Sequence, residues 1–273
     1  GLLAHPASFR RSVIREGLAG SLKAGEYEVA PGATPADVLE MLATGRVVLR
    51  AVTLVEGWTA RQALAAVQAH PAIAVTLPPG DAAALAEAVG LDDAPVEGRL
   101  FPDTYRFARG TTDRELLLTA RRRLDEVLAE AWAARDPDLP LESAYEALIL
   151  ASIVEKETGA ADERPLIAGV FANRLRRGMR LQTDPTVIYG LGDAFDGNLT
   201  RRDLERDTPY NTYTRAGLPP TPISLPGMAS LMAAVQPART NAMYFVARGD
   251  GTSQFSATLS EHNAAVRRFQ LGR

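Results

Sequence analysis

The stretch LILASIVEKETGAADERPLIAGVFANRLRRGMRLQTDPTVIY, residues 148–189, decides the fold of the second half of this chain. It begins with a helix that is apolar on every side, and such a helix belongs in a core. This helix runs directly into Glu155, Lys156 and Glu157, so two acids lie at the end where the helix dipole disfavours an ionised carboxylate. A carboxyl group that resists ionisation at neutral pH can act as a general acid. Two solvated glutamates ahead of an ordinary C-cap glycine, Gly159, are the alternative.

The two glutamates are two residues apart, so on a helix their side chains point about 200° away from each other. They therefore cannot act as a carboxylate pair on one bond. Glu157 is nearer the helix end and is the expected catalytic residue. Glu155 follows Leu148 and Ala151 on their face, and we expect it to pair with an arginine.

A short loop and a second helix follow the apolar helix. Asp162 is a candidate N-cap, Pro165 suits the first turn, and Gly178 suits the end of this second helix. Two helices joined by about four residues form an antiparallel hairpin. The hairpin would place Glu163 and Arg164 beside the acidic end of the first helix.

Two polar loops follow the hairpin and supply the groups that sugars need. The first holds an amide, a hydroxyl and a carboxylate, and the second holds an amide between tyrosine rings: Gln182, Thr183 and Asp184, then Tyr210, Asn211 and Tyr213. Taken singly, each has an explanation in turn chemistry. Together they favour a binding site for sugar hydroxyl and acetamido groups.

The first half of the chain alternates short strands and helices. The patterns predict strands at 26–29, 47–55 and around Tyr105, and helices starting at the caps Thr34, Thr59 and Thr112, with another helix at 82–89. The proline-containing break at 136–140 predicts a boundary between domains at 1–137 and 138–273. The second domain is expected to end with a proline-rich segment, a helix, a hairpin at 243–256 and a final helix.

The first half also contains a candidate repeat. Residues 27–39 match residues 105–117, and both read as strand, glycine turn, threonine cap and helix. We therefore predict two related αβ units, the first of them truncated before Gly1, and a chain that is a fragment of a longer protein. Chance similarity between strand–turn–helix units is the alternative.

Composition excludes several classes of function. The 273 residues are 46% hydrophobic and carry a formal net charge of −3, so nothing attracts the whole chain to nucleic acid. There is no cysteine, and the three histidines (His5, His70 and His262) are far apart, which argues against a metal site built on histidine or thiolate. No apolar run reaches the length of a membrane-spanning helix, and no signal-peptide pattern occurs.

Several motifs resemble one known family. They are SIVEKET (152–158), NRLRRGMRLQTDPTVIYGLG (173–192), PYNTYTRAGLPPTPISLPG (209–227), YFVARGDG (244–251) and Glu261-His262-Asn263, with LKAGEY, LVEG and LFPDTY upstream. Together they resemble the endolytic murein transglycosylase family (MltG, YceG-like), and the resemblance extends over nearly the whole chain.

The resemblance implies an α+β fold, in which a LysM-like αβ region, 1–137, precedes a mainly helical catalytic domain, 138–273, with a small β-hairpin. It implies internal, non-hydrolytic cleavage of the MurNAc–GlcNAc bond of peptidoglycan, which leaves 1,6-anhydro-MurNAc ends. Glu157 would act first as acid and then as base. The sugar would be bound by the remaining polar residues: Glu155, Gln182, Thr183, Asp184, Tyr210, Asn211 and Tyr213.

The resemblance further implies glycan strands as the partner, with peptidoglycan synthases as candidate protein partners, and neither cofactor nor metal. The location would be the outer face of the plasma membrane, with anchoring by one N-terminal helix that this sequence lacks. Two alternatives stay open: a muramidase that uses water, and a non-catalytic peptidoglycan-binding module in which the glutamates are structural.

Overall fold

The computed structural model of the protein describes residues 6–91 and 94–272, so His5 and the first residues of the chain lie outside it. The first half contains α1 (Pro6–Arg15), α2 (Pro35–Thr44), β1 (Leu49–Thr53), α3 (Ala60–Gln68), α4 (Ala82–Ala88), β2 (Thr104–Ala108) and α5 (Asp113–Ala133). The second half contains α6 (Ala144–Glu157), α7 (Arg164–Arg176), α8 (Asp184–Leu191), α9 (Arg201–Glu205), α10 (Met228–Val235), β3 (Tyr244–Ala247), β4 (Ser253–Ser256) and α11 (Leu259–Phe269). Strands β1 and β2 form one antiparallel pair and β3 and β4 another, and this mixture is the predicted α+β class.

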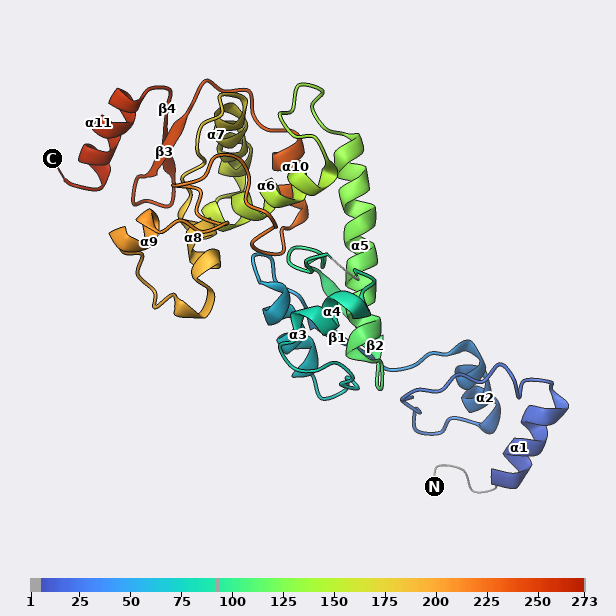
Figure 1. Ribbon diagram of the computed structural model, residues 1–273. Helices are drawn as coiled ribbons and strands as arrows, with labels where there is room; N and C mark the ends of the chain where they lie inside the picture. Colours follow the sequence, from blue (N-terminus) through green and yellow to red (C-terminus); the bar gives the residue numbers. More distant parts are fainter. Residues whose placement is uncertain (1–5, 92–93, 273) are drawn as a thin grey trace.

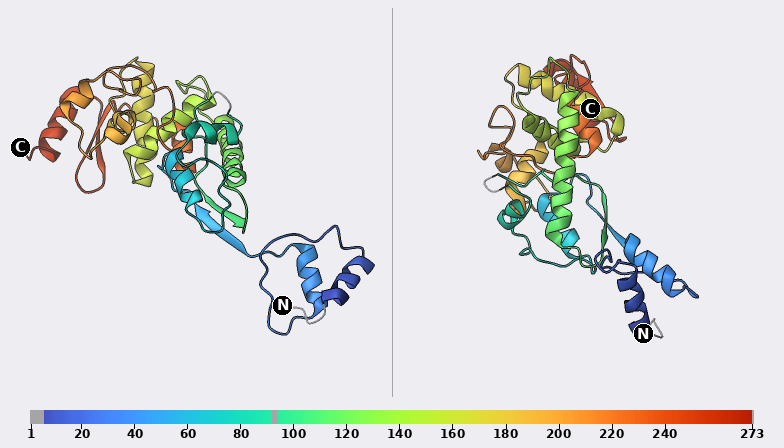
Figure 2. Two further views of the ribbon diagram at one scale, coloured as in Figure 1. Left: turned by 60° about the horizontal axis from the view of Figure 1, so that its bottom comes forward. Right: turned by 90° about the vertical axis from the view of Figure 1, so that its right-hand side faces the viewer.

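Helix α5 is the long connector between two hydrophobic cores (Figure 1). Its first turns bury Leu116, Leu117 and Ala120 against α3, α4 and β2, whereas its later turns bury Leu124 and Val127 against the core around α6. The change from one core to the other therefore lies inside α5, ahead of the 136–140 break. A view along another direction shows α5 spanning both parts (Figure 2).

The segment with α1 and α2 lies apart from the rest of the molecule in all views (Figures 1 and 2). The prediction of a strand at 26–29 is wrong, because this stretch is irregular. It makes one backbone hydrogen bond of the kind found in a sheet, from the amide of Val48 to the carbonyl of Glu26 at 2.7 Å. The carboxylate of Glu26 instead binds Arg50 of β1 and Arg109, the residue after β2, and so connects the segment to the first sheet.

The two copies of the candidate repeat share local hydrogen bonds. Tyr27 and Tyr105 each donate to the carbonyl four residues earlier, at 2.6 and 2.7 Å. Thr34 and Thr112 each begin a helix with a capping box. Only the second copy forms a strand, so duplication stays a prediction.

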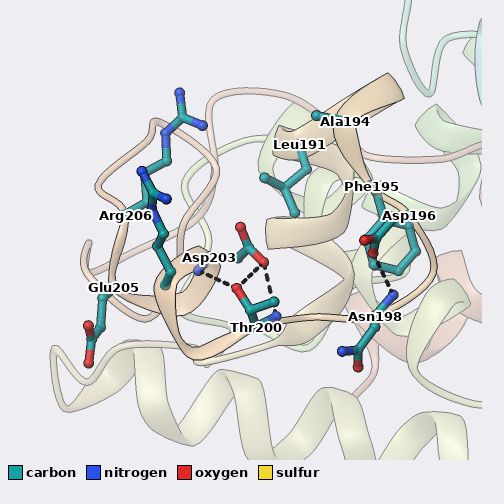
Figure 3. Close-up of a pocket in the computed structure, with 10 residues that line it drawn as sticks. Leu191, Ala194, Phe195, Asp196, Asn198, Thr200, Asp203, Glu205 and Arg206 are labelled. Atoms are coloured by element: carbon teal, nitrogen blue, oxygen red, sulfur yellow. Dashed lines mark hydrogen bonds between the residues drawn. The ribbon is translucent and has the colours of Figure 1, made fainter.

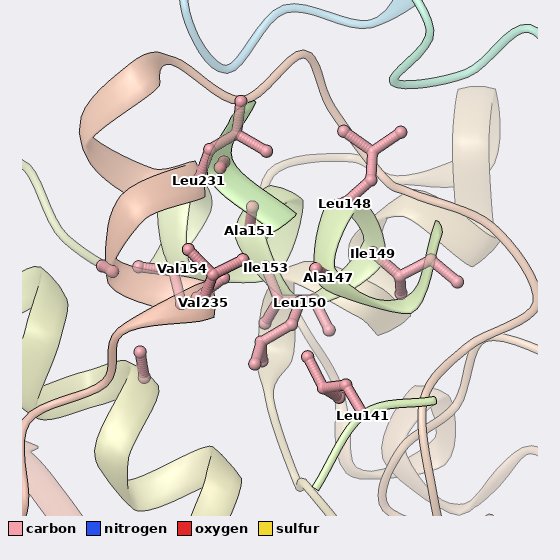
Figure 4. Packing of buried hydrophobic residues seen from close by; sticks show 14 of the residues in the cluster. Leu141, Ala147, Leu148, Ile149, Leu150, Ala151, Ile153, Val154, Leu231 and Val235 are labelled. Carbon is pink, nitrogen blue, oxygen red and sulfur yellow. The ribbon is translucent and has the colours of Figure 1, made fainter. Parts of the chain in front are cut away.

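Helix α6 is the centre of the second core, as its apolar sequence predicts. Its residues from Ala147 to Val154 are all buried, and Figure 4 shows them packed against Leu231 and Val235 of α10 and against Leu141. Helix α7 follows in the predicted hairpin. The N-cap predicted at Asp162 is wrong, because a 3₁₀ turn (Ala161–Glu163) intervenes and α7 begins at Arg164 without a side-chain cap.

The two cores meet through backbone pairing. The amide of Gly57 donates to the carbonyl of Leu225 at 2.8 Å, and the amide of Leu225 donates to Trp58 at 2.7 Å. Next to this contact, Gly98 adopts φ +74°, and a side chain there would collide with Pro222. The N-terminal region and the 222–227 segment therefore pack backbone against backbone.

Across the residues that the structure describes, we find no helix long and apolar enough to span a bilayer.

Candidate active site

Glu157 is the last residue of α6 and has an unusually basic carboxyl group. The side chain is partly buried, and this burial raises the pKa of Glu157 to about 7. The nearby charge of Asp184 acts in the same direction, whereas a hydrogen bond from Thr183 and the charge of Arg174 oppose it. The sequence pattern predicts the direction of this shift, but burial is its main cause instead of the helix dipole.

The loop that carries Thr183 is fixed by threonine hydroxyls. The Thr183 side chain donates to Oε1 of Glu157. Its own amide donates to Oγ1 of Thr212 at 3.0 Å, and its carbonyl accepts from Thr186 at 2.8 Å. The preceding residue, Gln182, has φ +50°, a left-handed conformation that is uncommon outside glycine and costs on the order of 1 kcal/mol or more. Its side chain is exposed at the surface beside Thr183.

Asp184 begins α8 immediately after Thr183 and is oriented by a tyrosine. The hydroxyl of Tyr213 donates to Oδ1 of Asp184 at 2.5 Å. Burial raises the pKa of Tyr213, and the adjacent acids Asp184 and Glu157 raise it further, so the phenol stays a hydrogen-bond donor. Four of the predicted residues are thus brought together: Glu157, Thr183, Asp184 and Tyr213.

Arg174 is a part of the site that the sequence analysis missed. This buried arginine of α7 donates from Nε to the carbonyl of Met243 at 2.7 Å and from Nη1 to the carbonyl of Leu181 at 2.6 Å. It also lies over the ring of Tyr244, whose other neighbour is the stacked imidazole of His262. The sequence did contain a signal for this role. Arg174 is one of the residues on the apolar face of α7 that begins at Ile167, and a charged side chain is unusual on such a face.

Glu155 points away from this group, as helix geometry predicts. It forms an ion pair with Arg164 at 3.6 Å, and the two side chains are only 6% and 12% exposed. Its other oxygen accepts from the amide of Gly227 at 2.9 Å. The predicted pairing with an arginine is confirmed, and Glu155 joins α6, α7 and the start of α10.

Asn211 and Tyr210 are engaged within the protein. The amide group of Asn211 donates to the carbonyls of Asp203, Leu204 and Arg206, and its oxygen accepts from the amide of Tyr213 at 2.8 Å. Tyr210 hydrogen-bonds Thr221 at 2.9 Å and meets the ring of Tyr189 edge-on. Both residues therefore order the loop around Tyr213 without offering a free polar group to a sugar.

Two surface cavities lie elsewhere and are not lined by Glu157. The larger, of about 920 Å³, is formed by the connection between α8 and α9 and by α9 itself (Figure 3). The smaller, of about 370 Å³, lies between α7 and the 237–240 segment. In residues 6–91 and 94–272, no three His, Asp or Glu side chains gather in a way that could hold a metal ion.

The comparisons with known proteins agree with one another. The model of the YceG-like family matches residues 1–268. An endolytic murein transglycosylase of Bacillus subtilis (strain 168) is 40% identical over 175 residues, which cover 64% of this chain and 48% of that protein. A second, from Streptococcus pneumoniae serotype 2, is 30% identical over 279 residues, covering 90% of this chain and 50% of the relative.

A solved structure resembles the fold as well. The crystal structure of a yceG-like protein from Listeria monocytogenes superposes with a TM-score of 0.66 at 33% identity, covering 94% of this chain and 89% of that one. The chain spans about half the length of the curated relatives it matches. Since the family model covers almost every residue described above, the protein belongs to the YceG-like family.

Proposed function

We propose that this chain cuts the glycan strands of peptidoglycan internally in the cell envelope, without water and without a metal or cofactor, and leaves 1,6-anhydro-MurNAc ends. Glu157 is the catalytic residue. Support comes from the family membership, from the names of the relatives and from the geometry around this one carboxyl group.

The observation that carries the proposal is the environment of the Glu157 carboxyl group. It has no ion-pair partner among the described residues, it is hydrogen-bonded by Thr183, and its pKa of about 7 makes it both a usable acid and a usable base near neutrality. Glu155, in contrast, is closed off by its ion pair with Arg164. A reaction in which one carboxyl group first gives and then takes a proton suits Glu157 alone.

The proposed steps conserve atoms and charge. Protonated Glu157 gives its proton to the oxygen between MurNAc C1 and GlcNAc as the C1–O bond breaks. The resulting carboxylate then takes the proton of the MurNAc 6-hydroxyl as O6 bonds to C1. Glu157 ends protonated again, and no water enters the products. A second carboxylate to activate water is therefore unnecessary.

The neighbouring groups have distinct roles in this proposal. The Asp184 carboxylate, oriented by Tyr213, supplies negative charge where positive charge develops at C1 in the transition state. Gln182, whose side chain is exposed, contacts the sugar, whereas Thr183 is only 2% exposed and acts through its hydrogen bond to Glu157. Asn211, Tyr210 and Glu155 act indirectly, by holding the loops and helices in place.

The test is mass spectrometry of purified glycan strands digested with the protein and with its Glu157→Gln variant. Anhydro ends from the wild type, together with glycan binding but no product from the variant, support the proposal. Reducing MurNAc ends would assign a muramidase that uses water. Unaltered strands that are nevertheless bound equally by both proteins would assign a non-catalytic binding module.

A further inference from the structure

The larger cavity combines three apolar lining residues with a set of polar and charged ones, which we call its rim. It is lined by Leu191, Ala194, Phe195, Asp196, Asn198, Thr200, Arg202, Asp203, Glu205 and Arg206. In Figure 3, Leu191 and Phe195 approach it from the α8 side, and Thr200 and Asp203 approach from the α9 side. Its volume of about 920 Å³ is within the range that small-molecule sites occupy.

The acids of the rim are already engaged within the protein. Asp203 accepts from the amide and the hydroxyl of Thr200 at 2.9 and 2.6 Å. Glu205 accepts from Arg201 at 2.7 Å. Asp196 accepts from the amide two residues later, which closes a turn. Each of these carboxylates therefore has one oxygen already occupied within the protein, and Glu205 is also paired with a cation.

The cations of the rim, in contrast, are available. Over the described ranges, neither Arg202 nor Arg206 has a side-chain hydrogen bond or an ion pair. Guanidinium groups bind carboxylates through paired hydrogen bonds. The cavity is therefore suited to a ligand that is partly apolar and carries carboxylates, and a neutral sugar would leave this chemistry unused.

The cavity is connected to the candidate active site by α8 and by Asn211. Helix α8 begins at Asp184 beside Glu157 and reaches the cavity at Leu191, about 10 Å further along its axis. The buried amide of Asn211 binds the carbonyls of two residues that line the cavity, Asp203 and Arg206, and also the backbone of Tyr213. A ligand held in the cavity is therefore within reach of a glycan strand bound at Glu157.

We propose that this cavity receives the peptide stem that a peptidoglycan strand carries on its MurNAc sugars. This proposal rests on the proposed function and adds a second recognition element to it. The stem is a short peptide with methyl side chains and free carboxylates. Its apolar part would lie on Leu191 and Phe195, and its carboxylates would bind Arg202 and Arg206.

The test compares two substrates: strands that bear stems, and the same strands stripped of stems by an amidase. We expect the wild type to prefer stem-bearing strands in kcat/KM by about tenfold, the order that one charge-assisted hydrogen bond produces. The double variant Arg202→Ala, Arg206→Ala should lose this preference. The control is Arg267→Ala, which removes an exposed arginine outside the cavity and leaves the hydrogen bonds of the rim carboxylates in place.

A preference that survives in the double variant, or that is lost equally in Arg267→Ala, overturns the proposal. A binding measurement separates it from the proposed function. Tetrapeptide stems released by the amidase should shift the NMR signals of Leu191 and Phe195 in the wild type and not in the double variant. If the wild type cuts neither substrate, the proposed function fails, and this titration alone decides for or against the stem site.

Discussion

Thr183 donates its hydroxyl hydrogen to Oε1 of Glu157, and this bond opposes the burial that otherwise keeps the carboxyl protonated. Burial and the charge of Asp184 raise the pKa of Glu157, whereas Thr183 and Arg174 lower it. The value of about 7 is therefore a balance between burial and charged or polar groups from two segments, α7 and the start of α8. Each of these side chains can be removed by a single substitution, so its effect on the pKa of Glu157 can be tested separately.

The first prediction concerns the pH dependence of glycan cleavage. Because Glu157 must be protonated to begin the reaction, kcat/KM should fall about tenfold per pH unit above its pKa of about 7. Thr183→Val should move this inflection to higher pH, since the lost hydrogen bond stabilised the ionised form. The measurement is kcat/KM on glycan strands from about pH 5 to 9. An unmoved inflection would show that the titrating group is not Glu157.

The second prediction concerns stability. The pKa of Glu157 is raised from 4.5 to about 7, so its contribution to the free energy of folding is lost as pH rises through this window. Glu157→Gln should therefore stabilise the chain at pH 8 by at most about 3 kcal/mol, and the difference should vanish below about pH 4. Denaturant unfolding at both pH values measures it. An equal effect at both would contradict the assigned pKa.

The third prediction separates the two glutamates. Glu155→Ala should reduce the free energy of unfolding by about 3 kcal/mol, because it leaves Arg164 buried without its partner. Glu155→Gln should retain bond cleavage in whatever fraction of the chain stays folded. The control is Glu205→Ala, which breaks an exposed pair with Arg201 and should cost under about 1 kcal/mol. Loss of cleavage in well-folded Glu155→Gln would transfer the catalytic role to Glu155.

Local signals in the sequence were enough for much of the fold. Thr112 and Glu115 form the predicted cap of α5, and the all-apolar α6 is buried as its pattern requires. The strand at 26–29 failed because a strand exists only when a partner pairs with it, and the partner is not encoded locally. The sequence pattern predicted a carboxyl group that resists ionisation at the end of α6, but not the main cause of the raised pKa of Glu157, because burial depends on the tertiary structure.

The roles of amides and cations were the least predictable part of the site. Asn211 has the residue type of a sugar ligand, yet its three carbonyl partners belong to α9 and the residue after it. Arg174 has the residue type of a surface cation, yet it is buried among backbone carbonyls. Side chains of these types can bind ligand or backbone, and only the tertiary structure decides between the two.

The fourth prediction concerns Arg174. Arg174→Met should destabilise the chain by about 2 to 3 kcal/mol, because the carbonyls of Leu181 and Met243 lose a charged donor. It should also raise the pKa of Glu157, since a nearby positive charge is removed. Arg174→Lys keeps the positive charge but lacks the planar guanidinium that donates to both carbonyls. The chain should therefore be less stable, while the inflection of the pH–rate profile stays near its original position. Equal inflections in all three proteins would exclude an electrostatic role for Arg174.

The last prediction concerns the contact that joins the first core to α8. Glu97 accepts from Tyr189 at 3.2 Å and from the amides of Ala60 and Gly98 at 2.9 and 3.2 Å, and burial raises its pKa. In a double-mutant cycle, Glu97→Ala and Tyr189→Phe should couple by about 1 kcal/mol, because removing either partner already breaks their shared bond.

The control cycle uses Arg61 and Asp193, which also join the first core to the end of α8 but are 60% and 80% exposed. Their coupling should be smaller and should fall on adding salt, since solvent screens exposed pairs. Because α8 begins at Asp184, Tyr189→Phe should also lower kcat/KM on glycan strands while the Arg61→Ala variant does not. Additive effects of the Glu97 and Tyr189 substitutions, with unaltered kcat/KM, would mean that the first core does not help to position α8.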